Sequence, residues 1–128
     1  RWTRRNFVLN DLDFKRHTLV CEDGLAFLAE AVARRARFDL IVLDPPSFSN
    51  SKRMDTTFDV QRDHPALVRQ CLALLAPDGE LYFSNNRRGF RLDADLASEA
   101  AFEEITARTV QADFARHRPH RCWRVTRG

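Results

Sequence analysis

The residues with the clearest potential for chemistry follow a short apolar run and read Asp44-Pro45-Pro46-Ser47-Phe48. Each proline restricts the residue before it to an extended conformation, so a carboxylate, a rigid turn and an aromatic ring are held together. The preceding run, Phe38–Leu43, has strand length and is almost wholly apolar, which predicts a parallel strand buried on both faces. Ligands bind at the carboxyl ends of such strands. The pattern predicts either a binding site or an ordinary proline-rich turn.

A second carboxylate, Asp23, precedes a predicted helix. Apolar residues recur at helical spacing at Leu25, Leu28, Ala29 and Val32. Asp is a favoured N-cap residue, so we expect Asp23 to begin this helix.

The elements that must position these residues alternate between helix and strand. Expected helices cover residues 2–12, a segment from Leu25 onward, a long segment from about His64 and residues 92–100. Pro65 would then stand in the first turn of the long helix. Expected strands are 17–21, 38–43, 80–84, 102–109 and 121–126, with a polar loop at 47–59 and a turn at 76–79. This order predicts an α/β sheet closed by an antiparallel pair.

Composition narrows the possible partners. The chain has 128 residues, which indicates one small domain or part of a larger one, and a formal net charge of +3. No apolar run is long enough to span a bilayer, so we expect no membrane partner. The three widely spaced cysteines favour reduced thiols and hence a cytoplasmic protein. Arginine dominates the basic residues, which suits nucleic acid but also follows from a GC-rich genome. Two arginine clusters stand out: Arg87, Arg88 and Arg91, and the acid-free stretch from Arg116 to Arg127.

Cysteine and histidine spacing gives no convincing metal site. Cys21, Cys71 and Cys122 are far apart, which favours reduced thiols. His117, His120 and Cys122 lie near one another in an arginine-rich stretch without a clear fourth ligand. We expect no metal.

The turn at Asp44 resembles motif IV of S-adenosylmethionine-dependent methyltransferases that act on nucleobases or amides, with the aromatic residue displaced by one position. Longer stretches resemble the bifunctional bacterial 23S ribosomal RNA guanine methyltransferase at the end of its C-terminal half: residues 44–54, 58–64, 83–90 and 113–116. That half is associated with N7-methylation of guanine, whereas the N-terminal half, which carries a THUMP domain, methylates a guanine N2 amine. Departures are small: Pro65 and Pro77-Asp78-Gly79 replace more usual residues.

The resemblance implies the C-terminal part of a Rossmann-like sheet ordered 3-2-1-4-5-7-6, lacking the first two strands and the glycine-rich cofactor loop. Residues 1–128 would then be a partial catalytic domain, inactive alone, that is completed by other chain or exchanges elements with a second copy. The implied cofactor is S-adenosylmethionine, and the implied cofactor-binding residues are Asp23, Gly24, Asp44 and Pro45. Asp23 would hold the adenine amine, act only as a helix cap, or do both.

The resemblance also implies 23S rRNA as substrate, with substrate-binding residues Pro46, Ser47, Phe48, Lys52, Arg53, Asn85, Asn86, Arg87, Arg88 and Arg91. Phe48 would stack on a flipped-out guanine or fill the core. The arginines of the first cluster would bind phosphates or pair with Asp93 and Asp95.

Guanine N7 carries a lone pair and no proton, so the resemblance requires no general acid or base. Residue chemistry alone favours an amine instead, because a carboxylate accepts hydrogen bonds and would repel guanine O6. Asn85 and Asn86 can donate to O6 or N7, or can simply form a turn. A non-catalytic basic RNA-binding or assembly module is the alternative from a different class.

Overall fold

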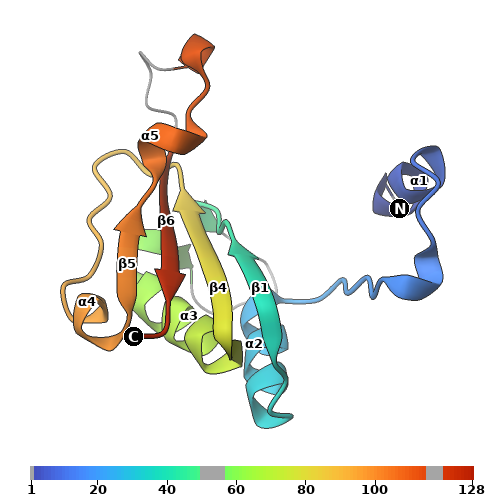
Figure 1. Ribbon diagram of the computed structural model, residues 1–128, viewed down its shortest axis with the longest axis horizontal. Coiled ribbons are helices and arrows are strands. Elements are labelled where there is room, and N and C mark those ends of the chain that lie inside the picture. Colours follow the sequence, from blue (N-terminus) through green and yellow to red (C-terminus); the bar gives the residue numbers. More distant parts are fainter. Residues whose placement is uncertain (1, 50–56, 115–119) are drawn as a thin grey trace.

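The computed structural model describes residues 2–49, 57–114 and 120–128. Its main sheet has four strands in the order β1-β4-β6-β5 (Figure 1). Strands β1 and β4 are parallel, whereas β6 runs antiparallel to both β4 and β5. This is the 4-5-7-6 part of the expected strand order, so the predicted α/β class and antiparallel closing pair are confirmed.

The sheet is formed by β1 (Phe38–Leu43), β4 (Leu75–Asn85), β5 (Ala101–Glu104) and β6 (Arg121–Thr126). Helices α2 (Gly24–Ala33) and α3 (Val60–Leu74) lie on one face of it (Figure 1). Short elements complete the chain: β2 (Phe48–Ser49), β3 (Phe58–Asp59), α4 (Leu96–Glu99) and α5 (Thr106–Thr109), with 3₁₀ turns at Phe14–Arg16 and Ala112–Phe114. Helix α1 (Trp2–Leu9) stands away from the sheet (Figure 1).

The core lies between α3 and the sheet. Phe83 of β4 stacks on Trp123 of β6 with ring centroids 5.6 Å apart, and Phe90 contacts both rings. Phe83, Leu81 and Val125 are fully buried. These residues share one face of the antiparallel pair, as alternation along each strand requires.

The long helix starts earlier than predicted. It begins at Val60, so Pro65 stands beyond the first turn, and the prediction of a start near His64 is wrong. Proline has no N–H to donate to the carbonyl of Gln61, four residues before it. The buried His64 imidazole supplies a partner, because its Nδ1 lies 3.0 Å from that oxygen and 2.9 Å from the carbonyl oxygen of Val60.

Two further element predictions need correction. Residues 76–79 do not separate helix from strand; they belong to β4 as an irregularity between the pairs Phe38↔Leu75 and Leu40↔Glu80. A side chain on Gly79 would meet the Asp39 carbonyl oxygen at 3.0 Å, which explains a glycine there. The expected strand 102–109 ends at Glu104 and continues as α5. The Thr106 hydroxyl accepts from the Cys122 N–H, which ends the ladder.

The polar loop expected at 47–59 also contains regular structure. Its ends pair as the short antiparallel strands β2 and β3, with Phe48 opposite Asp59. Residues 50–56 between them lie outside the described residues.

The N-terminal elements are less buried than predicted. Residues 17–21 form no strand, and no strand of the described ranges pairs with them. The prediction that β1 is buried on both faces is wrong, because α2 and α3 cover only one face of the sheet (Figure 1). Leu40 and Val42, on the other face, are 60% and 71% exposed. No helix in the described ranges has the length and apolarity needed to cross a bilayer.

Candidate functional site

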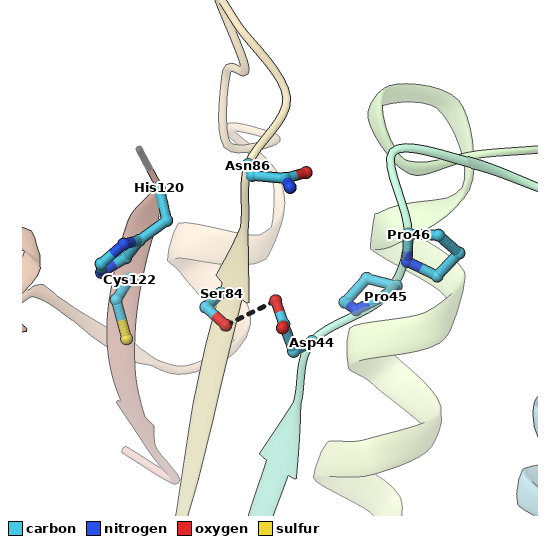
Figure 2. Close-up of a pocket in the computed structure, with 7 residues that line it drawn as sticks. All are labelled: Asp44, Pro45, Pro46, Ser84, Asn86, His120 and Cys122. Carbon is cyan, nitrogen blue, oxygen red and sulfur yellow. Dashed lines mark hydrogen bonds between the residues drawn. The ribbon is translucent and has the colours of Figure 1, made fainter. Parts of the chain in front are cut away.

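The turn after β1 forms a wall between two clefts. Asp44, Pro45 and Pro46 line an apolar cleft of about 420 Å³ toward α2 and also a polar cleft of about 640 Å³ toward β4 and β6. Figure 2 shows the polar cleft, with Asp44 at the end of β1 and the two prolines beyond it. The predicted binding edge is therefore a place where two cavities meet at one rigid turn.

The apolar cleft brings together the predicted cofactor-binding residues Asp23, Gly24, Asp44 and Pro45. Oδ1 of Asp23 accepts from the N–H groups of Leu25 and Ala26, both at 3.0 Å, which confirms the predicted N-cap of α2. A side chain built on Gly24 would meet open space. This cleft is lined mainly by apolar residues, together with the carboxylates Asp23 and Asp44.

The polar cleft adds donors and acceptors from β4 and β6. The Ser84 hydroxyl donates to Oδ1 of Asp44 at 2.8 Å (Figure 2), which fixes that carboxylate. His120 and Cys122 lie on the opposite side, and His120 Nε2 lies 2.8 Å from the Thr109 hydroxyl. Burial and the nearby Asp44 carboxylate raise the pKa of the Cys122 thiol, which therefore stays protonated rather than acting as a nucleophile.

The turn and the loop after β4 contact each other through consecutive residues. The Ser47 hydroxyl donates to Oδ1 of Asn86 at 2.8 Å. The next residue, Phe48, carries the Arg87 guanidinium over its ring, 5.2 Å from the centroid. Arg87 also forms an ion pair with Asp59, which is the N-cap of α3. Four of the predicted substrate-binding residues are thus connected.

Other predicted substrate residues lie apart from the cleft. Asn85 is buried, and its Oδ1 accepts from the Arg87 N–H at 3.2 Å. This contact agrees with the alternative that Asn85 forms a turn. Its Nδ2 has no partner among the described residues. Arg88 and Arg91 are exposed. Lys52 and Arg53 lie outside the described residues.

Sequence reasoning missed Ser84, His120 and Cys122 as lining residues. Ser84 could have been predicted from the sequence, because parallel pairing of two strands that both end at the site places it beside Asp44. Cys122 pairs with Ser84 across an antiparallel ladder. The amino end of β6 therefore meets the carboxyl ends of β1 and β4. Among the described residues, no group of three His, Cys, Asp or Glu side chains has metal-binding geometry.

Comparisons with known proteins connect the chain to methyltransferases. No protein-family model matches it. It is 48% identical over 124 residues to "Ribosomal RNA large subunit methyltransferase K" of Neisseria meningitidis serogroup B, covering 97% of this chain and 35% of that protein. It is 49% identical over 125 residues to "Ribosomal RNA large subunit methyltransferase K/L" of Marinobacter nauticus, covering 97% of this chain and 17% of that protein. The chain therefore spans about a third or less of these relatives.

A solved structure described as a methyltransferase complexed with SAH has a TM-score of 0.70 against this chain at 21% identity. The match covers 95% of this chain and 34% of that structure. The chain therefore has part of the Rossmann-like α/β fold found in S-adenosylmethionine-dependent methyltransferases, as the resemblance implied.

Proposed function

We propose that this chain is part of an S-adenosylmethionine-dependent methyltransferase that methylates guanine in 23S rRNA, at N7. The observation that carries the proposal is the shared wall of Asp44, Pro45 and Pro46 between an apolar and a polar cleft. Methyl transfer is an in-line displacement, so the donor and the acceptor must be aligned on either side of the transferred group. Two clefts that meet at one rigid turn suit that requirement.

The apolar cleft suits the adenosine end of S-adenosylmethionine. The cap of α2 uses Oδ1 of Asp23, and the second carboxylate oxygen remains able to accept from an amine. Leu25 and Leu28 provide apolar walls for a flat ring. When bound, the cofactor supplies an activated methyl group. One end of the cofactor would be held by Asp23, Gly24, Asp44 and Pro45. A complete protein as long as the relatives would have room for the remaining contacts.

The polar cleft suits the acceptor edge of guanine. Because Ser47 donates to Oδ1 of Asn86, the amide Nδ2 is left as a donor beside the turn (Figure 2). Guanine O6 and N7 are both acceptors. N7 carries no proton, so transfer to it needs no general base, and the protonated Cys122 thiol makes no covalent intermediate.

A second candidate is methylation of the guanine N2 amine. Asp44 favours it, because only one of its carboxylate oxygens accepts from Ser84 and the other can accept from an amine. The relatives' names do not distinguish the two positions. In both cases Pro46, Ser47, Phe48 and Asn86 would contact the base.

We infer the rRNA substrate from the relatives' names and from the exposed Phe48 and Arg88. Stacking on an aromatic ring and charge on the loops are the usual means of binding single-stranded nucleic acid. Lys52, Arg53, Arg88 and Arg91 would contact phosphates. A cytoplasmic location agrees with such a substrate and remains a prediction.

We also infer that residues 1–128 need further chain for activity. The exposed apolar side chains of β1 lie on a strand with one unpaired edge. Chain outside this sequence, or a second copy that exchanges elements, would cover them. Without such cover the chain would serve at most as a basic RNA-binding module, which is the alternative function.

The test is methyl transfer by the complete gene product to unmodified 23S rRNA, with the modified nucleoside identified by mass spectrometry. We expect N7-methylguanosine. N2-methylguanosine without N7-methylguanosine would favour the second candidate, and no transfer with intact RNA binding would favour the RNA-binding module. Isothermal titration should give S-adenosylmethionine binding for the complete product and weak or absent binding for residues 1–128. Micromolar binding by the monomeric short chain would contradict the inference that it is incomplete.

In the same assay, Phe48→Ala tests which of the two clefts depends on the Phe48 ring. We expect lower methylation of rRNA with nearly unchanged cofactor affinity, because Phe48 lies on the Asn86 side of the turn. Loss of cofactor binding with retained RNA binding would place Phe48 in the other cleft.

A further inference from the structure

Arg87 differs from its neighbours in the arginine cluster by being held in place. Its guanidinium covers one face of the Phe48 ring and pairs with Asp59, and the two charged side chains are only 27% and 25% exposed. Asp59 is fixed in turn, because its Oδ1 accepts from the Gln61 N–H at 2.8 Å and its own N–H donates to Asp63 at 2.9 Å. The backbone N–H of Arg87 is bound to Asn85.

Phe48 depends on these contacts for its position. Its side chain is 62% exposed, and its strand β2 consists of two residues paired with β3. An exposed ring on so short a strand has little packing to fix its rotamer. The flat, weakly hydrated guanidinium of Arg87 provides one fixed side, at a separation typical of cation–π contacts.

We propose that Arg87 is a positioning residue that holds the Phe48 ring as a stacking surface for an RNA base, and is not a phosphate contact. The inference rests on the proposed function, in which Phe48 stacks on the target base. Arg87 and Asp59 neutralise each other and support one ring face, while a base stacks on the exposed remainder of the ring. Arg88 and Arg91, which are exposed and form no ion pair within the described ranges, are the residues of this loop that remain available for phosphate.

The two roles of Arg87 differ in a measurable way. A phosphate contact contributes to the dependence of RNA affinity on salt, and its loss lowers the log–log slope by about 0.7 to 0.9. A positioning role contributes to RNA affinity only when a base is present to stack on the Phe48 ring. The ratio of affinities for a single-stranded RNA containing guanine and the same RNA with one abasic site measures this contribution. Stacking on an aromatic ring gives a ratio of about 5- to 150-fold.

The experiment measures this ratio and the salt slope for the complete gene product and four variants. Phe48→Ala should abolish the ratio. Arg87→Ala should reduce it at least about 3-fold with an unchanged slope, and so should Arg87→Lys, because lysine keeps the charge but lacks the planar group. Arg88→Ala should lower the slope and keep the ratio.

The outcomes separate the inference from the proposed function. If Phe48→Ala leaves the ratio unchanged, the stacking role in the proposed function is wrong. If Phe48→Ala abolishes the ratio but Arg87→Ala and Arg87→Lys do not alter it, only the positioning role is wrong. A lower slope for Arg87→Ala with an unchanged ratio would make Arg87 a phosphate contact.

Asp59→Asn gives a variant that keeps the helix cap. Asparagine caps a helix as well as aspartate does, so the fold is retained while the ion pair is lost. The positioning role predicts a reduced ratio. A phosphate role for Arg87 predicts the opposite effect, tighter RNA binding, because the guanidinium would be released from its partner. Thermal melting of each variant confirms that it is folded.

Discussion

Two regions of this chain handle apolar residues in opposite ways. The packed unit (α3, β4, β5 and β6 with their connections) contains nearly all of the buried hydrophobic side chains; before Phe58 only Ala31 is buried among the described residues. The open segment (residues 2–43) contains nearly all of the exposed large ones, the exceptions being Phe48 and Phe114. Helix α1 has no buried residue at all.

The difference does not follow from the apolar content of the elements. β1 is as apolar as the buried residues of β4 that face α3, and the two strands pair directly. Leu81 and Phe83 of β4 are fully buried because α3 covers one face and strands lie on both sides. Leu40 and Val42 of β1 point to the other face of an edge strand. Burial of a strand residue is therefore decided by the elements packed around it. The apolar pattern of β1 indicates only that the strand is suited to a buried position.

Phe83→Ala should have the largest effect. Phe83 stacks on Trp123 and contacts Phe90, so its truncation leaves a cavity that costs about 3–5 kcal/mol of unfolding free energy. Val42→Ala is the matched control in the open segment, and we expect a change within about 0.5 kcal/mol. Urea denaturation of residues 1–128 measures both. Similar losses in the two variants would remove the distinction between the regions.

Leu40→Ala tests whether the open segment is covered in the complete protein. In residues 1–128 the substitution should change the unfolding free energy by no more than about 0.5 kcal/mol, since Leu40 is exposed. In the complete gene product we expect a loss of about 2–3 kcal/mol, the lower range for truncation of a buried leucine. Chemical denaturation of both proteins gives the comparison. A negligible effect in the longer protein would mean that β1 remains open there.

The fold was predicted well where local signals and neighbours agreed. Asp23 caps α2 as expected, and β6 has the predicted bounds, because each depends on signals within a few residues. The start of α3 was missed, since Pro65 suggests a helix start unless the His64 side chain replaces its missing donor. The strand predicted at 17–21 is not formed, since pairing is a non-local requirement and no strand of the described ranges pairs with these residues.

The site was predicted in outline but not in connectivity. Asp44 and the prolines predict the turn. That the turn separates two clefts depends on the positions of α2 and β6. The contact between Phe48 and Arg87 joins residues 39 positions apart. Only a register between β1 and β4 could have placed their two loops together. Arg87 was therefore grouped with Arg88 by spacing, although its contacts differ.

The packed unit should also respond to pH through His64. Burial lowers the pKa of this imidazole, whose Nε2 accepts from the Asp93 N–H, so the folded chain holds it neutral. A histidine with a folded pKa below its unfolded value of about 6.5 stabilises the fold above that pH. Unfolding free energy should fall as pH drops below about 6.5, by at most about 1.4 kcal/mol per pH unit for one proton.

Urea denaturation between pH 8 and pH 5 measures this dependence, and His64→Gln, where folded, should flatten it. The Asp63 carboxyl titrates below this range, because Arg62 holds its pKa below the usual value. A stability that is constant from pH 8 to pH 5 would contradict a neutral buried His64.

Asp23→Ala should have a modest effect on stability and the sharpest consequence for the site. Loss of two hydrogen bonds at the N-terminus of α2 should cost about 1 kcal/mol. Asp23→Asn keeps the cap and should cost little, but its amide replaces the free carboxylate oxygen with a donor or a weaker acceptor. If Asp23 also holds the adenine amine, both variants weaken S-adenosylmethionine binding by the complete protein, while only Asp23→Ala lowers its melting temperature. If Asp23 is a cap alone, Asp23→Asn binds the cofactor as tightly as the unaltered protein does. Isothermal titration beside thermal melting therefore decides whether this carboxylate of the open segment belongs to the site or only to the helix.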